Sequence, residues 1–359
     1  MMVIVNTINL KREETAMKIT TVGLDLAKTV FHAVCFDDHS KEVKKRILRR
    51  NQLRIFFTQL SPCMVGMEAC ASSNYWGREL KALGHEVKLI PAQHVKPYLL
   101  GNKNDFNDAR AIAEAMTRPH IRGVALKTAE QQDIQAIHRM RSQCLRDRTA
   151  LCNSVRGLLA EYGIVLSQGI STLRKNIHGM LEDAENGLSL TFRNLLARRY
   201  EQLLELDGHI NFFTHELEIQ SQQGDACQRL QEIPGYGPII ASAFYSNVGN
   251  GEGYSRGRDV AASLGLVPRQ HSTGGKNVLL GISKRGDGYL RCLLIHGARS
   301  VVIHASKKKD KLSQWINRIV AERGKNKAAV AVANKMARIG WAVLRHSTHY
   351  QAALTVSSL

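Results

Sequence analysis

The sequence predicts a three-part chain: a mixed α/β domain at 17–125, a long helical region at 126–225 and a mainly α-helical C-terminal domain at 226–350. Three observations predict it. Short apolar strands open the first part, apolar residues recur every three or four positions in the second, and Gly/Pro turns with a basic excess mark the third. With 359 residues, of which 44% are hydrophobic, the chain can form more than one core.

The first part is expected to have the order β-β-β-α-β-α-β-α. Three strands in series, separated by short polar turns, predict an antiparallel meander, and the later strands alternate with helices. The expected strands are residues 19–26, 30–36, 43–48, 64–68 and 85–91, and the expected helices are 51–60, 74–84 and 104–118. The domain is expected to end near Gly123.

The middle part has a helical apolar repeat. Apolar residues recur at 134, 137, 140, 144, 151, 155 and 158, and again at 192, 196, 200, 203, 206, 210, 213 and 217. These steps predict long amphipathic helices. Because turn signals are few outside Gly163 and residues 169–187, we expect a helical hairpin or coiled coil that acts as a spacer or oligomerisation arm.

The C-terminal part opens with IPGYGPIIASAF, in which Gly235 and Gly237 predict a tight turn with backbone N–H groups free at a helix start. Helix-hairpin-helix elements hold a DNA phosphate in this way, although an ordinary turn between packed helices has the same residues. A glycine-rich loop with hydroxyls and cations follows, which indicates phosphate contacts. Its residues are Arg269, Ser272, Thr273, Gly274, Lys276, Ser283, Lys284, Arg285 and Arg291. A serine there could attack a phosphodiester, but residue types alone favour a non-covalent contact.

Net charge indicates a polyanionic partner. The chain carries +19, with 17 basic and 10 acidic residues in 17–125, 11 and 13 in 126–225, and 20 and 6 in 226–359. Nucleic acid or an anionic membrane would satisfy such a surface. The middle part does not share this role.

Cysteine and hydropathy patterns bear on the compartment. Seven scattered cysteines without a C-x-x-C pair argue against a disulfide framework or zinc knuckle and favour a reducing cytoplasm. No membrane span is expected, because Lys335 and Arg338 interrupt the longest apolar run. The first sixteen residues have their apolar part before the charges, the reverse of a secretory signal, and Met17 is an alternative start.

Four acids are candidate metal ligands: Asp25, Glu68, Asp105 and Asp108. Asp25 lies inside the first strand, Glu68 ends the fourth, and the last two lie three apart on one face of the following helix. Phosphoryl-transfer sites with two cations about 3.5–4 Å apart need several oxygen ligands. Strand ends and one helix face can bring these four together.

Each acid also has a simpler interpretation. A buried, unpaired carboxylate is costly, so Asp25 needs a partner, which is either a metal or a cation such as Lys28. Asp37, Asp38 and Glu42 lie in a turn and are expected to be solvated. The element order, with acids on strand one, strand four and the last helix, matches the RNase H-like fold of RuvC-type nucleases.

Six ordered motifs carry a family resemblance. They are VGLDLAK, GMEACASS, KNDFNDARAIAEA, PGYGPIIA, LGLVPRQHSTGGK and GISKRGDGYLR. From Met17 to about His346 the chain resembles the DEDD insertion-sequence transposases, which are described as bridge-RNA-guided recombinases.

The resemblance implies a RuvC-like domain whose D-E-D-D set is Asp25, Glu68, Asp105 and Asp108, then a coiled coil and a C-terminal transposase domain. It also implies a covalent serine nucleophile in a composite site with the acidic cluster of another protomer. Ser272 is the expected nucleophile, and Thr273 is its rival.

The sequence therefore predicts a transposase that cuts and rejoins DNA with Mg²⁺ (or Mn²⁺) as cofactor. Expected partners are DNA (element ends and target), a structured non-coding guide RNA and further copies in a dimer or tetramer. Expected DNA contacts are Gly235, Gly237, Arg269, Thr273, Gly274, Lys276, Lys284, Arg285 and Arg291. One alternative is a RuvC-type junction nuclease that uses metal-activated water. A non-catalytic nucleic-acid-binding protein is the other, and the intact set of four acids argues against it.

Overall fold

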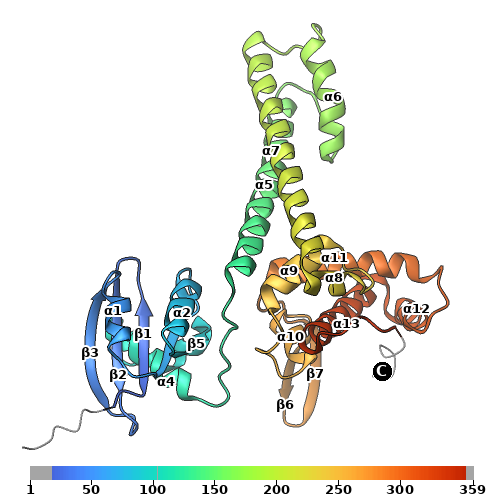
Figure 1. Cartoon of the computed structure of the whole chain (residues 1–359). Helices are drawn as coiled ribbons and strands as arrows, with labels where there is room; N and C mark the ends of the chain where they lie inside the picture. Colours follow the sequence, from blue (N-terminus) through green and yellow to red (C-terminus); the bar gives the residue numbers. More distant parts are fainter. Residues whose placement is uncertain (1–17, 103, 353–359) are drawn as a thin grey trace, which may run out of the picture. The chain divides into compact units, whose positions relative to one another are not determined.

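The computed structural model describes residues 18–102 and 104–352 and divides into two compact units, the first ending at Thr128 and the second beginning at Ala129 (Figure 1). Each unit has its own hydrophobic core. All seven cysteines are free. Within the described residues, every helix is too short or too polar to cross a membrane.

The first unit contains a five-stranded sheet of order β3-β2-β1-β4-β5. Its strands are β1 (Thr21–Leu26), β2 (Val30–Phe36), β3 (Glu42–Arg49), β4 (Met64–Glu68) and β5 (Glu86–Ile90). The first three pair antiparallel, whereas β4 runs parallel to β1 and β5 runs parallel to β4. The predicted meander and the mixed α/β character are confirmed.

Helices cover both faces of this sheet. They are α1 (Leu53–Thr58), α2 (Ser73–Ala82), α3 (Ala92–Val95), the 3₁₀ helix η1 (Lys96–Tyr98) and α4 (Asp105–Thr117), of which α3 and η1 were not predicted. Val22, Leu24 and Phe31 share a core with residues of α1 and α2. The opposite face packs on α4, because a Cβ on Gly23 would lie 2.0 Å from the Ala109 carbonyl oxygen.

The second unit begins with an arm of three helices: α5 (Ala129–Ala160), α6 (Ile170–Glu182) and α7 (Leu190–Gln223) (Figure 1). Arg141 of α5 donates to Thr214 of α7 at 2.7 Å, and Arg148 pairs with Asp207 at 2.9 Å, so the two long helices run antiparallel. The predicted long helices are confirmed. However, α6 lies in a segment expected to be turn.

The remaining helices form the largest core of the chain. They are α8 (Asp225–Gln231), α9 (Pro238–Val248), α10 (Gly257–Ser263), α11 (Gly288–Ala305), α12 (Lys311–Arg323) and α13 (Lys325–His346). His138 of α5 joins the arm to this core. Its Nε2 lies 3.1 Å from the Ser242 hydroxyl and its Nδ1 lies 2.9 Å from that of Tyr289.

The glycine-rich segment forms a hairpin, and the prediction of a loop there is wrong. Strands β6 (Pro268–Thr273) and β7 (Lys276–Ile282) pair antiparallel around Gly274 and Gly275. These two glycines have φ values of 55° and 76°. Because both turn residues need positive φ in a type I′ turn, a Gly-Gly pair between two extended segments favours a hairpin.

Candidate acidic metal centre

The alternation of side chains along β1 and β4 places two of the predicted acids, Asp25 and Glu68, on the face of the sheet that α4 covers. Asp25 has the same parity on β1 as Gly23, and Glu68 has the same parity on β4 as Gly66. Both glycines face α4, since a Cβ on Gly66 would lie 2.8 Å from the Met116 sulfur. Successive side chains of a strand point to opposite faces, so Asp25 and Glu68 lie on the α4 side of the sheet.

Three acids come together at the N-terminal end of α4. One carboxylate oxygen from each of Asp25, Asp105 and Asp108 lies within 4.8 Å of the others. Asp105 and Asp108 come from the first turn of α4, whereas Asp25 comes from the sheet. Glu68 is outside this group of three, but it acts electrostatically on Asp25.

The electrostatics of Asp25 fit a cation site. Burial, the largest cause, and the negative charges of Asp108, Asp105 and, more weakly, Glu68 together raise its pKa from 3.8 to about 6. His32 acts in the opposite direction. A divalent cation would remove the repulsion among these oxygens, which are the hard ligands that Mg²⁺ and Mn²⁺ prefer.

A cap and an aromatic contact fix the start of α4. The Asn104 side chain accepts a hydrogen bond of 2.9 Å from the Phe106 backbone N–H. The Phe106 ring meets His32 edge to face, with ring centroids 4.9 Å apart, and Lys45 lies over the same ring at 5.9 Å. These contacts hold the helix end that carries Asp105 against β2 and β3.

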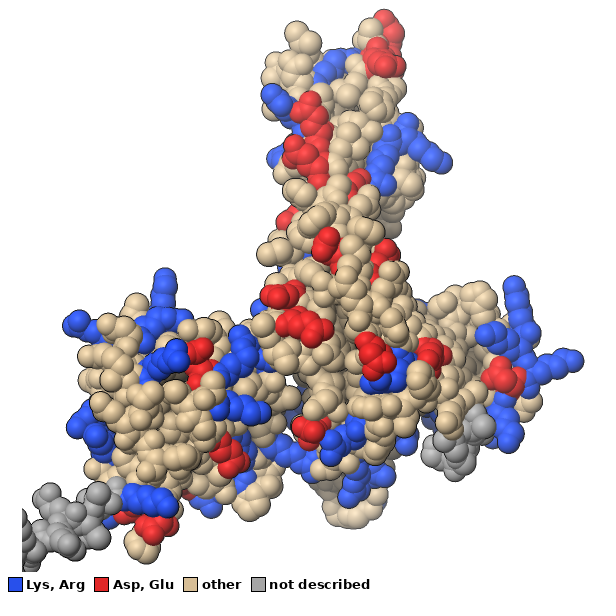
Figure 2. All heavy atoms as spheres, in the orientation of Figure 1, with Lys and Arg blue, Asp and Glu red and all other residues tan. Residues whose placement is uncertain are grey.

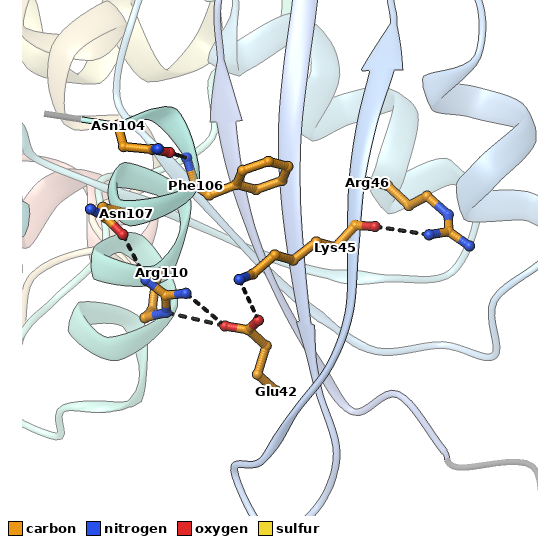
Figure 3. A network of polar contacts seen from close by, with 7 residues as sticks. All are labelled: Glu42, Lys45, Arg46, Asn104, Phe106, Asn107 and Arg110. Carbon is orange, nitrogen blue, oxygen red and sulfur yellow. Dashed lines mark hydrogen bonds and ion pairs between the residues drawn. The ribbon is translucent and has the colours of Figure 1, made fainter.

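An ion-pair network adds a second connection between α4 and the sheet (Figure 3). Arg110 of α4 donates to Glu42 of β3 through Nε at 3.1 Å and through a terminal nitrogen at 2.9 Å. Lys45 pairs with Glu42 at 2.9 Å, and Arg110 also donates to Asn107. Burial alone would raise the pKa of Glu42, but the hydrogen bonds from Lys45 and Arg110 outweigh it and lower that pKa. The expectation that Glu42 is solvated is therefore wrong.

His32 is a neighbour of the acidic centre that the sequence analysis missed. It is the cross-strand partner of Asp25, and its Nδ1 lies 3.5 Å from Asp105 Oδ2. This nitrogen is buried and has no hydrogen-bond partner among the described residues. Pairing the two predicted antiparallel strands in register would have placed His32 opposite Asp25, and this could have identified it.

Ser272 lies in the second unit, on the exposed strand β6. Its Oγ donates to Asn277 Oδ1 at 2.9 Å and accepts from Gln270 Nε2 at 2.8 Å. Thr273, the alternative nucleophile, is the last residue of β6 before the turn. Arg269, Gly274, Lys276, Lys284 and Arg285 are also exposed.

Two other predicted contact residues have structural partners. Arg291 donates to the carbonyl oxygens of Leu264 and Arg285, both at 2.9 Å, so it braces the segment before α11. A Cβ on Gly235 would lie 2.9 Å from the Gly297 carbonyl oxygen, which makes this position a close helix contact. Gly237, by contrast, precedes α9 with open space around it.

The surface charge follows the distribution predicted from the sequence. Figure 2 shows Lys and Arg on the visible face of the first unit and around α12 in the second. Acidic and basic side chains are interspersed along the arm. The basic surfaces therefore belong to the same parts of the chain as the acidic centre and the hairpin.

Comparisons with known proteins match both units. Residues 22–164 match a family described as "Transposase", and residues 227–314 match the "Transposase IS116/IS110/IS902 family". A "Probable family 20 transposase" of Pseudomonas aeruginosa is 46% identical over 93% of this chain and 99% of its own. The "Transposase for insertion sequence element IS1111A" of Coxiella burnetii is 42% identical over 95% and 94%. That for element IS1328 of Yersinia enterocolitica is 39% identical over 92% and 98%.

Proposed function

The chain belongs to the IS116/IS110/IS902 family of insertion-sequence transposases, and we propose that it cleaves and rejoins DNA strands with the acidic centre of its first unit. One observation carries this proposal: carboxylate oxygens of Asp25 on β1 and of Asp105 and Asp108 on α4 lie within 4.8 Å of one another. The β-β-β-α-β-α-β-α order is consistent with the RNase H-like fold that the D-E-D-D family implies.

Divalent metal use follows from the family, and we propose Mg²⁺ (or Mn²⁺) as the ion. Asp25, Asp105 and Asp108 would hold it, and Glu68, on the same face of the sheet, would be the fourth ligand. The bound ion would stabilise the negative charge that develops on the phosphodiester oxygens. Asn104, Phe106 and the Glu42–Arg110 pair keep the α4 ligands in position.

Ser272 is our proposed nucleophile. Its Oγ forms a bond to phosphorus while the bond from phosphorus to one strand oxygen breaks, and the proton of the hydroxyl passes to that leaving oxygen. In rejoining, a strand hydroxyl forms a bond to phosphorus while the bond from phosphorus to Ser272 Oγ breaks, and the proton of the strand hydroxyl passes to Oγ. The hydrogen bonds from Gln270 and to Asn277 support this role, because they hold the Oγ at a fixed position on β6.

We propose that Arg269, Thr273, Lys276, Lys284 and Arg285 contact DNA phosphates, since all five are exposed near Ser272 in the sequence. The turn at Gly235 and Gly237 would contribute backbone N–H groups at the start of α9, and Arg291 would act by holding Arg285. Binding of a structured guide RNA is a further part of the proposal, supported by the basic surfaces of both units.

A cleavage assay with DNA that carries element ends tests the chemistry. Ser272→Ala should abolish a protein–DNA adduct that survives denaturing electrophoresis, whereas Thr273→Ala should retain it. Asp25→Asn and Asp105→Asn should lose cleavage altogether. Cleavage without an adduct in the unmodified chain would instead favour a nuclease that uses metal-activated water.

We also propose that the acidic centre and Ser272 of different protomers form one site in a dimer or tetramer, joined through the α5 and α7 arm. Mixing Asp25→Asn chains with Ser272→Ala chains tests this. In a dimer with shared sites, about one site in four keeps both intact halves, so activity should return to roughly a quarter of normal. A site within one chain would give no recovery.

A further inference from the structure

A cavity of about 430 Å³ lies in the second unit, and no residue of the hairpin that carries Ser272 lines it. Its walls are the start of α10 at 256–258, α13 from Lys335 to Val343 and the segment 348–351. This volume is in the range of small-ligand pockets, about 300–1,000 Å³. Glu232 holds the segment 348–351, because it accepts from the Tyr350 backbone N–H at 2.9 Å and contacts His349 at 2.7 Å.

Four cations line this cavity: Arg256, Arg258, Lys335 and Arg338. A Cβ on Gly257 would lie 2.9 Å from the Arg338 carbonyl oxygen, so the start of α10, which carries Arg256 and Arg258, touches α13 at Arg338. No acid lines the cavity, and within the described residues none of the four cations forms an ion pair.

Lys335 is the most buried of these four cations. Its ammonium lies 5.1 Å from the centre of the Trp315 ring, and burial followed by the charge of Arg338 lowers its pKa. Like charges that converge without a counter-charge repel one another and favour an anion. The cavity is therefore preorganised for a negatively charged group.

The rest of the lining has a polar part, with Thr348, His349 and Gln351, and an apolar part. Ile339, Ala342 and Val343 of α13 form much of it, beside Trp341, whose indole N–H donates to the Gly251 carbonyl oxygen at 3.0 Å. A suitable ligand therefore has an anionic part and a compact apolar part. A nucleotide has both, in its phosphate and its base, and a positively charged groove with aromatic side chains against the bases is a common mode of single-strand binding.

We propose that this cavity binds one unstacked nucleotide of a nucleic-acid strand, with its phosphate at Arg256, Arg258 and Arg338 and its base against Ile339 and Ala342. The proposal rests on the proposed function only in taking nucleic acid as the substrate. A duplex is too wide for a cavity of this volume, so the nucleotide must be unpaired when it enters.

Fluorescence anisotropy with the full chain, without metal, tests this. The probes are a 12-nucleotide oligothymidylate and a fully abasic strand of equal length and charge. The unmodified chain should bind the first at least about fivefold more tightly. Ala342→Phe fills the cavity but keeps the cations, so it should abolish that preference while binding to the abasic strand persists. Ala342→Leu, a smaller change, should give an intermediate result.

A charge-matched comparison isolates the cations. The triple variant Arg256→Gln, Arg258→Gln, Arg338→Gln should weaken binding of both probes more than Lys311→Gln, Lys325→Gln, Lys327→Gln, which removes three exposed charges elsewhere in the same unit. Equal losses, or an unchanged base preference in both Ala342 variants, would overturn the proposal. Repeating the assay with oligouridylate distinguishes RNA from DNA. Because no catalysis is measured, a failed cleavage assay leaves this test intact.

Discussion

Asp25→Asn should make the metal-free protein more stable at neutral pH, although it removes a metal ligand. Burial and the neighbouring carboxylates raise the pKa of Asp25 from 3.8 to about 6. The folded chain therefore binds this proton more tightly than the unfolded chain. The stability that protonated Asp25 contributes is complete below pH 3.8 and is lost as the pH rises through about 6.

The size of the effect follows from that pKa. A rise from 3.8 to about 6 corresponds to at most about 3 kcal/mol at pH 7.5, and solvent screening of the half-buried carboxylate reduces this to about 1–2 kcal/mol. Asparagine has no charge, so Asp25→Asn should regain that amount. At pH 4.5 only about a third of the difference should remain, because the folded wild-type chain is then protonated.

Scanning calorimetry at pH 4.5 and 7.5 measures this difference, with Asp38→Asn, an exposed turn acid, as the control. A gain of about 1–2 kcal/mol should raise the unfolding temperature of the first unit by roughly 4–10 °C. Mn²⁺ should stabilise the wild-type chain and not Asp25→Asn, because ligand binding stabilises only the state that binds. A variant less stable than wild type at pH 7.5 would refute the electrostatic reasoning.

Two further predictions concern packing and pH. Gly23→Ala should destabilise the first unit by more than about 2 kcal/mol, because its Cβ would lie 2.0 Å from a carbonyl oxygen of α4, whereas Gly157→Ala, with open space in α5, should stabilise by about 0.5–1 kcal/mol. Denaturant unfolding measures both, and equal effects would contradict the close contact. Burial lowers the pKa of His138 to about 4, so the second unit should lose stability as the pH falls from 6.5 to 4. His138→Gln should remove this loss in calorimetric titrations, and an unchanged profile would exclude His138 as its source.

The first unit was predictable because its signals are local. Strand alternation in TVGLDL and VFHAVCF fixes which side chains share a face, and short polar turns fix the meander. In the structure, β1 pairs with β4 so that Gly23 lies opposite Gly66, which puts Asp25 and Glu68 on one side of the sheet. This side of the sheet can pack closely on α4 only because Gly23 and Gly66 have no Cβ. The periodicity of the sequence does not indicate which glycines face a helix.

Other features depend on partners distant in sequence. Glu42 resembles any turn acid until Arg110, 68 residues away, binds it. Gly274 and Gly275 suit a phosphate-binding loop and a type I′ turn equally by composition, and the extended segments on either side decide for the turn. The cavity at Arg338 joins residues from the start of α10, from α13 and from the segment 348–351, so no single motif could reveal it.

Glu42 also helps to explain why a chain of net charge +19 has, among its described residues, no Lys or Arg paired with the acidic centre. Arg110 lies on α4 and Lys45 lies over the Phe106 ring of α4, yet both are bound to Glu42. Within the described residues no Lys or Arg pairs with Asp25, Asp105 or Asp108. Removing the negative charge of Glu42 should therefore release Arg110 and Lys45 beside the proposed metal ligands.

We expect Glu42→Gln to lower the pKa of Asp25 and to weaken Mn²⁺ binding, although the variant keeps every proposed ligand. Carboxyl NMR titration and Mn²⁺ titration by electron paramagnetic resonance measure the two effects, with Glu114→Gln at the other end of α4 as the control. Unchanged Mn²⁺ affinity in Glu42→Gln would mean that the network only fixes α4 and does not keep Arg110 and Lys45 away from the centre.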